Sequence, residues 1–164
     1  MDTRWLSEDE RHAWIRLAAV VELLPRELDA QLQRDEQLSH FDYFSLAMLS
    51  EAPARRLRLT ALAAMTNATL PRLSRVMSRL EAEGWVQREP CPGDKRAVNL
   101  VLTEAGWEKV VHAAPGHVGT VRSLVIDVLT PEQIAQLSEV LDRVLAVLDP
   151  EQRVMASALR PSGT

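Results

Sequence analysis

The sequence has little of what secreted and membrane proteins depend on. It contains one cysteine, Cys91, among 164 residues, so a disulfide framework within the chain is excluded and a reducing compartment is expected. It has no run of about 18 apolar residues, the length that a membrane-spanning helix needs. The first residues lack the apolar segment of a signal peptide. We therefore expect a cytoplasmic protein that does not enter a membrane.

Catalytic and metal-binding motifs are also missing. There is no phosphate-binding glycine loop, nucleophile elbow or metalloprotease helix motif, so we do not expect an enzyme. The four histidines are not spaced as zinc ligands and have no accompanying cysteine or paired carboxylate; they are His12, His40, His112 and His117. We expect neither a metal nor a cofactor. Cys91 has no second cysteine with which to form an intramolecular disulfide, which argues against redox sensing.

The net charge of −4 hides an uneven distribution. Residues 54–102 contain nine Lys/Arg and four Asp/Glu, whereas the rest of the chain contains ten and nineteen. A basic lobe on an acidic body is typical of a nucleic-acid-binding module. The acidic body would confine non-specific DNA contact to that lobe. The length corresponds to one domain-sized unit with a core of its own.

The basic region predicts a helix-turn-helix. Thr60 can cap a short first helix with its hydroxyl group, and Asn67 marks the turn after it. Thr69 can cap a second helix with Pro71 in its first turn, and Gly84 ends that helix. The second helix, residues 70–83, has an apolar face at helical spacing that consists of Leu70, Leu73, Val76, Met77 and Leu80.

The opposite face of this helix is made of Arg and Ser rather than a Glu/Lys mixture. At about 100° per residue, that face presents Pro71, Arg75, Ser78 and Ala82, with Arg72, Ser74 and Arg79 on its flanks. Such a face suits DNA, because arginine binds guanine with two hydrogen bonds in the major groove. A solvated helix face is the alternative. We expect base contacts from Arg75 above all, with Pro71, Ser74 and Ser78 beside it, and phosphate contacts from Arg72 and Arg79.

A hairpin follows the second helix. Residues 85–89 and 98–102 are strand-like, and residues 90–96 form the loop between them. Lys95 and Arg96 lie at its tip, where a wing enters the minor groove or lies on phosphates, and Asp94 can pair with Arg96. Residues 55–59 are expected to form a short strand that pairs with this wing. Arg55, Arg56 and Arg58 are equally well explained by solvation and by contact with the DNA backbone.

Helices are predicted on both sides of this lobe. Ser7 with Glu10 forms a capping box that opens a helix reaching about residue 34, which Pro25 should kink or break. A second box, residues 39–42, opens a helix that ends near residues 52–53. Thr103 caps a helix after the wing, and residues 114–116 should bend it.

The C-terminal part is predicted to contain one more long helix. It starts at Thr130 with Pro131 in its first turn. Residues 149–152 can open a short last helix, and residues 160–164 are expected to be frayed.

The terminal segments carry more apolar residues than one small lobe needs. Either they cover the back of the lobe or, as we favour, they pair with the same segments of a second chain. We expect a mainly α fold with a minor β part: dimerisation helices over residues 1–53 and 103–164, and a winged helix-turn-helix over residues 54–102. A dimer would hold two recognition helices about 34 Å apart, one DNA turn, and its affinity would depend steeply on salt.

Several motifs of the chain resemble the MarR family of bacterial transcriptional regulators. They are Leu62-Ala63, residues 75–88, Asp94-Lys-Arg96 and Leu102-Thr-Glu-Ala-Gly106; the last two are the most specific. The resemblance covers nearly the whole chain. It implies a homodimer, usually a repressor, that binds a pseudo-palindromic DNA operator. It also implies that a small, often aromatic or phenolic, effector can release the DNA.

In this family the effector pocket usually lies where the first, second and fifth helices meet the DNA-binding lobe. Here that region offers Trp14, His40, Tyr43, Phe44, Met48 and Met65, although aromatic residues at helical spacing more often belong to a core. Two alternatives stay open. One is a helical, dimeric protein–protein interaction module whose winged lobe no longer reads DNA; the other is a regulator that occupies DNA without an effector.

Overall fold

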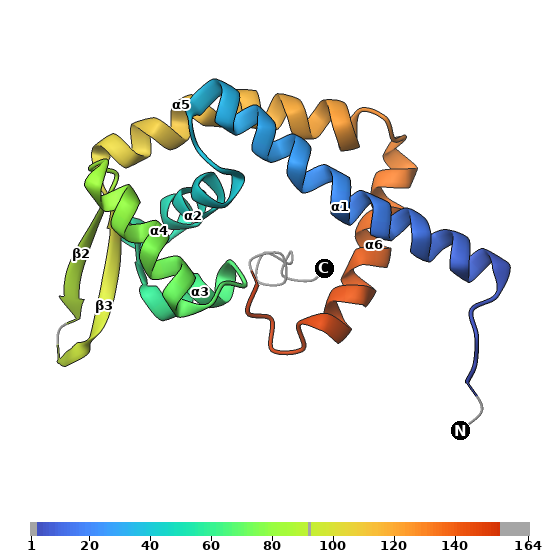
Figure 1. The fold of residues 1–164 in the computed structure, drawn as a ribbon, viewed down its shortest axis with the longest axis horizontal. Helices are drawn as coiled ribbons and strands as arrows, with labels where there is room; N and C mark the ends of the chain where they lie inside the picture. The colour runs from blue at the N-terminus through green and yellow to red at the C-terminus, as the bar shows by residue number, and fades with distance from the viewer. Residues whose placement is uncertain (1–2, 92, 155–164) are drawn as a thin grey trace.

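The computed structural model describes residues 3–91 and 93–154, and for residues 94–96 it describes the backbone alone (Figure 1). Over this part the order of the helices and strands is α1 (Glu8–Glu36), α2 (His40–Glu51), β1 (Arg56–Arg58), α3 (Leu59–Met65), α4 (Leu70–Ala82), β2 (Val86–Cys91), β3 (Asp94–Leu102), α5 (Glu104–Val121) and α6 (Pro131–Leu148). A 3₁₀ turn, η1 (Pro53–Arg55), precedes β1, and a π-helical turn, η2 (Arg122–Ile126), follows α5. The mainly α fold with a small sheet is confirmed.

Side-chain caps set most helix starts. Ser7 and Ser39 form the expected capping boxes of α1 and α2, in which side chain and backbone of two residues satisfy each other. Thr69 and Thr103 accept from the first turns of α4 and α5. Thr130 completes a further capping box on α6. The predicted starts of these five helices are confirmed.

Other local expectations are wrong. Thr60 does not cap α3, which begins at Leu59, two residues earlier than that cap would give, with Arg58 in the cap position and no side-chain cap. Pro25 does not break α1, and α5 continues through Pro115; the kink expected at Pro25 and the bend expected at residues 114–116 stay predictions. A proline removes one backbone hydrogen bond, and buried residues beyond it, such as Leu28 and Leu32 in α1, keep the helix packed. Helix α5 instead leaves α geometry later, at η2.

The C-terminal end of the described chain is a turn rather than the short helix expected at residues 149–152. The Gln152 amide donates to the Asp149 carbonyl, and the Asp149 carboxylate accepts from the amides of Arg153 and Val154. The acid therefore closes a turn and does not start a helix. The fraying expected at residues 160–164 falls outside the described residues.

The three strands form one antiparallel sheet in the order β1-β3-β2. Leu57 lies opposite Leu100, which confirms that the segment before the first reading helix pairs with the wing. The loop predicted at 90–96 is wrong, because β2 continues to Cys91 and β3 begins at Asp94. Pro90 is tolerated since β2 is an edge strand, and Cys91 is buried and donates its thiol to Asn99 Oδ1 at 3.0 Å.

The core lies where the lobe of residues 54–102, which contains α3, α4 and the sheet, packs against α2, the C-terminal part of α1 and the first part of α5. Its fully buried side chains include Leu32, Leu46, Leu49, Leu62, Leu73, Leu80 and Leu100. Helix α5 joins the wing tightly, because the Thr103 hydroxyl donates to the Gly84 carbonyl at 2.7 Å. At Gly106 an added Cβ would lie 2.1 Å from the Trp85 carbonyl oxygen, so only glycine fits that approach.

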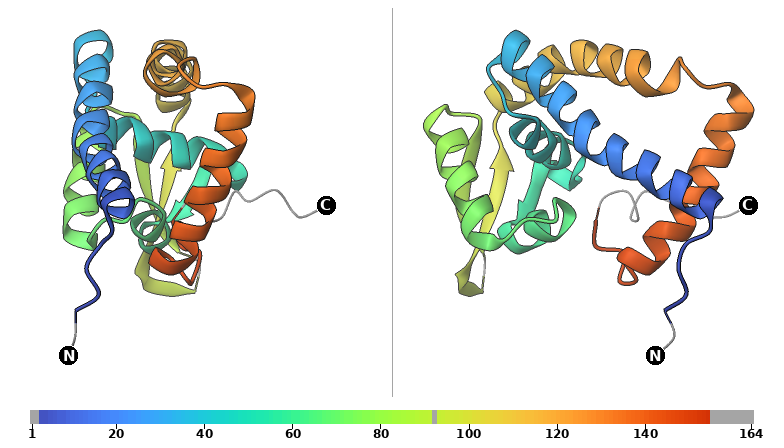
Figure 2. Two further views of the ribbon diagram at one scale, coloured as in Figure 1. Left: turned by 90° about the vertical axis from the view of Figure 1, so that its right-hand side faces the viewer. Right: turned by 45° about the vertical axis from the view of Figure 1, so that its right-hand side comes forward.

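Outside the lobe, α1, α5 and α6 form an open frame (Figures 1 and 2). Helices α1 and α5 extend away from the lobe, and α6 turns back from the far end of α5 (Figures 1 and 2). Helix α6 buries none of its residues, and the N-terminal part of α1 exposes Trp14, Ile15, Val20 and Val21. The described residues contain no helix long and apolar enough to cross a membrane.

Candidate nucleic-acid interface

Helix α4 is the centre of the candidate interface. Leu73, Met77 and Leu80 are fully buried against the lobe, as the apolar spacing predicts, whereas Leu70 is 46% exposed. The opposite side presents Pro71, Arg75 and Ser78 to solvent. The predicted polar face is therefore exposed in this structure.

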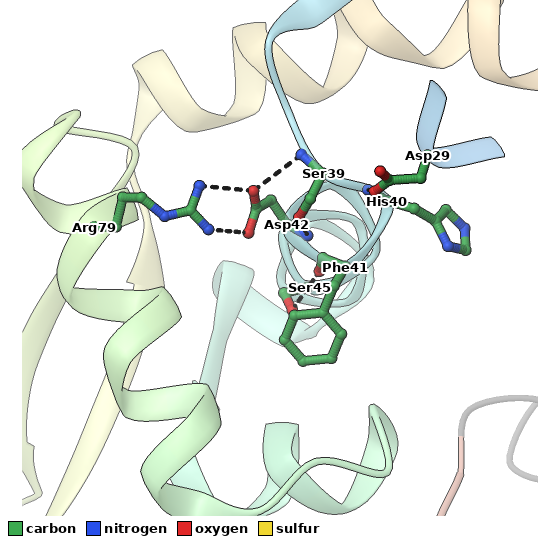
Figure 3. Close-up of polar contacts among 7 residues, drawn as sticks. All are labelled: Asp29, Ser39, His40, Phe41, Asp42, Ser45 and Arg79. Carbon is green, nitrogen blue, oxygen red and sulfur yellow. Dashed lines mark hydrogen bonds and ion pairs between the residues drawn. The ribbon is translucent and has the colours of Figure 1, made fainter. Parts of the chain in front are cut away.

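On one flank α4 is fixed to α2 (Figure 3). The Arg79 guanidinium donates two hydrogen bonds, of 2.8 and 2.5 Å, to the two carboxylate oxygens of Asp42. Asp42 is completely buried and also accepts from the Ser39 amide at 3.0 Å. The hydrogen bond to Asp42 raises the pKa of Arg79. Arg79 thus joins the recognition helix to α2 through a bidentate pair, and its expected phosphate contact stays a prediction.

The other two arginines of α4 differ from Arg79 and from each other. The Arg72 guanidinium carbon lies 4.3 Å from the centre of the Phe41 ring, a cation–π contact with α2. Arg75 forms no ion pair within the described residues; its Nε only donates to the Pro71 carbonyl, at 3.4 Å. Arg75 therefore has its guanidinium at the surface and ready to bind.

The opposite flank of α4 is held by Arg88 of β2. Its guanidinium donates to the Ser78 hydroxyl at 3.0 Å, the Ser74 carbonyl at 2.8 Å and Glu81 Oε2 at 3.1 Å. Its backbone amide donates to Glu81 Oε1 at 3.2 Å. Sequence reasoning did not single out this residue. The available signal was strand alternation, because Arg88 shares a strand face with the buried Val86 two residues before it.

The wing lies beside this helix. Gly93, with a φ of +85°, precedes Asp94 in the turn between β2 and β3, and this left-handed backbone favours glycine. Lys95 and Arg96 begin β3 close to that tip. Their expected groove and phosphate contacts, and the pair of Asp94 with Arg96, involve side chains outside the described part.

The three arginines around β1 are mostly engaged within the protein. Arg55 forms an ion pair with Glu104 at 2.9 Å and lies over the Trp107 ring. Arg56 pairs with Glu89 across the sheet at 2.8 Å. Arg58 is exposed. Two of the three therefore have structural partners within the protein.

Two of the six candidate effector residues line a common cavity. His40 and Phe44 border a hollow of about 560 Å³ between α1, α2 and the start of α4, together with Glu22, Pro25, Arg26, Asp29, Phe41 and Arg72. The other four do not line it: Tyr43 and Met48 are buried in the core, Met65 packs against the core, and Trp14 is 59% exposed on α1.

A pair of histidines lies at the same junction. The ring centres of His40 and His117 are 5.7 Å apart, and Tyr43 lies 4.6 Å from His117. Burial lowers the pKa of both histidines. Among the described residues, no group of three or more His, Cys, Asp or Glu could hold a metal ion.

The chain was compared with protein-family models and with known proteins, and the matches indicate one family. The MarR family model matches residues 38–98. Sco3205, a MarR family transcriptional regulator from Streptomyces coelicolor whose crystal structure is in complex with DNA, is 43% identical, with a TM-score of 0.87 over 97% of this chain and 99% of that one. AbsC, a MarR family transcriptional regulator from the same organism, is 38% identical, with a TM-score of 0.84 over 89% of this chain and 98% of that one.

Two further proteins are similar to this chain over a smaller part of its length. A mutant MarR from E. coli, complexed with operator DNA, is 27% identical over 79% of this chain and 91% of that one, with a TM-score of 0.69. The transcriptional regulator PecS of Dickeya dadantii is 37% identical over 71 residues, 42% of this chain, and that match spans only 40% of PecS. The family consists of regulators and not enzymes. This chain belongs to the MarR family of transcriptional regulators.

Proposed function

We propose that this protein is a sequence-specific, double-stranded DNA-binding repressor that acts as a homodimer on a pseudo-palindromic operator. One observation carries the proposal: the outward face of α4 presents the exposed Arg75, which has no ion pair among the described residues, while both flanks of the helix are braced against the lobe. A braced helix with a free arginine suits the major groove, because base reading needs a fixed geometry.

The remaining cations fit the usual division of a DNA interface. Phosphate contacts position a protein, and base contacts give specificity. Helix α4 would enter the major groove with Arg75 toward the bases, and the wing with Lys95 and Arg96 would lie on the backbone or in the minor groove. The relatives that were crystallised with DNA support DNA binding.

The homodimer is supported by surface that one chain leaves uncovered. Helix α6 buries none of its residues, and its exposed side chains include the apolar Val140 and Leu141. Pairing α1, α5 and α6 with a second copy would cover them and hold two α4 helices about 34 Å apart.

The effector proposal concerns the cavity beside His40 and Phe44. Its lining has aromatic walls and two arginines, Arg26 and Arg72, beside two acids, Glu22 and Asp29. The aromatic rings and Arg72 together could bind the ring and the carboxylate of a small aromatic acid. Arg72 belongs to α4, so a ligand there would contact the recognition helix directly. A coupling of about 1–3 kcal/mol would change DNA affinity 5- to 150-fold.

The DNA proposal is tested by selection from a random duplex pool with the purified protein. We expect a two-fold symmetric motif that Arg75→Ala weakens at particular bases. Arg34→Ala, at an exposed position on α1, is the matched control and should leave the motif unchanged. No enrichment, or salt-labile binding that Arg75→Ala does not alter, would instead favour the interaction-module alternative.

The effector proposal has its own test. Benzoate, as the simplest aromatic acid, is titrated by calorimetry against the wild type and Arg72→Gln, and operator affinity is measured with and without it. We expect binding that Arg72→Gln weakens, and weaker operator affinity with ligand. Ligand binding that leaves operator affinity unchanged would end this proposal.

A further inference from the structure

We propose that Leu70 is a specificity-determining residue that binds the C5 methyl group of one thymine in each half-site. This inference rests on the proposed DNA binding and adds to it the identity of one base. It starts from an apolar side chain of α4 that the protein leaves uncovered.

The exposure of Leu70 is unusual for its part of the chain. Leu70 is 46% exposed, although helical spacing places it on the same face as the buried Leu73 and Met77. Among the side chains that the structure describes between residues 54 and 102, it is the only large hydrophobic one that is exposed. The other exposed large hydrophobic residues lie before residue 24 or after residue 110, in the segments proposed to form the dimer. Leu70 is separate from those segments.

Leu70 lies where a recognition helix meets the bases. It is the first residue of α4. The side chains of a helix tilt toward its N-terminus, so that of Leu70 extends toward the open end of the helix. In helix-turn-helix proteins the N-terminal residues of the recognition helix contact base edges.

The wing reaches the same end of α4. Strand β2 runs back from the end of α4 toward the side where α4 begins (Figure 1). Arg88, in the middle of β2, donates to Ser78 and also to Ser74, one turn nearer the start of the helix. The turn at Gly93 follows β2 in that direction. The start of α4 and the wing tip therefore lie on one side of the lobe, the side proposed to face DNA.

The charges at the start of α4 allow DNA to approach. The first turn of α4 contains no acidic residue, whereas the first turns of α1, α2, α5 and α6 each contain at least one. The charged side chains nearest to Leu70 along α4 are those of Arg72 and Arg75. An apolar helix start followed by two arginines suits a contact with base edges between two rows of phosphates.

Thymine is the base that offers an apolar partner in the major groove. It carries a C5 methyl group there, whereas guanine, adenine and cytosine present donors and acceptors without a methyl group. A leucine side chain has no polar atom, so it gains free energy by removing apolar surface from water. Burying one methyl group against Leu70 favours thymine by about 4-fold.

The test compares thymine with uracil, which differs from it by that methyl group alone. Selection from a random duplex pool with the wild type and Leu70→Ala first locates the thymine whose selection depends on Leu70. Deoxyuridine then replaces this thymine in both half-sites, and fluorescence anisotropy measures the affinities. We expect the wild type to bind the substituted duplex roughly 15-fold more weakly, about 4-fold for each half-site. Leu70→Ala should bind both duplexes equally, and Leu70→Met, still apolar, should keep the discrimination.

Arg58→Met is the matched control, because it removes an exposed cation of β1 and no apolar contact. It should keep the wild-type discrimination, whatever its effect on affinity. Leu70→Ala should also sediment as the wild type does; its dissociation into monomers would assign Leu70 to a contact between two copies and overturn the inference. A motif without a thymine that depends on Leu70, or equal wild-type binding of thymine and uracil there, overturns this inference alone. No wild-type motif overturns the DNA proposal as well.

Discussion

The arginines of α4 are alike in sequence and different in their surroundings. Helical spacing predicts which face they share, and the structure agrees. Helical spacing cannot predict that Arg79 pairs with Asp42, because that partner lies 37 residues away in the sequence and is brought near by tertiary packing. For the same reason the serines of the reading face were predicted, whereas Arg88, which donates hydrogen bonds to two of them, was not.

Asp42 is the residue whose carboxylate joins α2 to α4. We expect Asp42→Asn to lower the free energy of unfolding by about 1–3 kcal/mol, because a buried bidentate acceptor and a helix cap are both weakened. Chemical denaturation measures the loss. Glu83→Gln, an exposed acid on the same side of α4, is the control and should change stability little; an equal loss in both variants would contradict this role.

The histidine pair gives the protein a pH-dependent stability. Burial lowers the pKa of His40 and His117 below the ordinary value of 6.5, so below that pH the unfolded chain binds protons that the folded chain does not. The free energy of unfolding should therefore fall as pH is lowered from about 6.5. Thermal unfolding between pH 7 and pH 5 measures this.

A variant separates this effect from general acid sensitivity. His117→Gln should flatten the dependence on pH, because it removes one of the two partly buried imidazoles. His12→Gln, at an exposed position of α1, is the control and should keep the wild-type slope. Equal slopes in the two variants would count against the buried pair as the cause.

At the scale of elements, helix starts were easier to predict than helix ends and loops. A cap needs only a residue and its neighbours three positions on, so Ser7, Ser39 and Thr69 were found correctly. The extent of β2 depends on its partner: Cys91 continues the strand because it pairs with Asp94 of β3, and no local pattern contains that contact.

The joint between the wing and α5 depends on Gly106. We expect Gly106→Ala to destabilise the fold by about 1–3 kcal/mol or more, the cost of overpacking, since its Cβ would lie 2.1 Å from the Trp85 carbonyl oxygen. Gly119→Ala is a matched control in the same helix, with nothing within 4 Å of the added Cβ. It should gain up to about 1 kcal/mol of helix propensity. Thermal unfolding of both variants distinguishes them.

At the scale of the whole molecule, the lobe has a packed core, whereas α1 and α6 leave apolar side chains exposed. The basic residues cluster at 54–102 and the apolar excess lies in the terminal segments; the division into domains at these bounds stays a prediction. The orientation of α1 and α6 has no counterpart in local sequence, since it depends on the turn η2 and on what each helix packs against.

The exposed apolar face of α6 should be needed for assembly and not for folding of the lobe. We expect Leu141→Glu to shift the protein from dimer to monomer in sedimentation experiments and to weaken operator binding, because a charge is placed in an apolar contact. Ser138→Glu, an exposed polar position on the same helix, should leave the dimer intact. A Leu141→Glu protein that stays dimeric would locate the interface elsewhere.

The uncovered frame also bears on how such a regulator responds to its own abundance. If reading a two-fold operator requires two copies, occupancy at low expression rises with the square of the number of chains, so a modest change in synthesis produces a sharper change in repression. Some variants would also be dominant-negative. A chain that assembles normally but binds DNA poorly would form mixed dimers with normal chains and impair them.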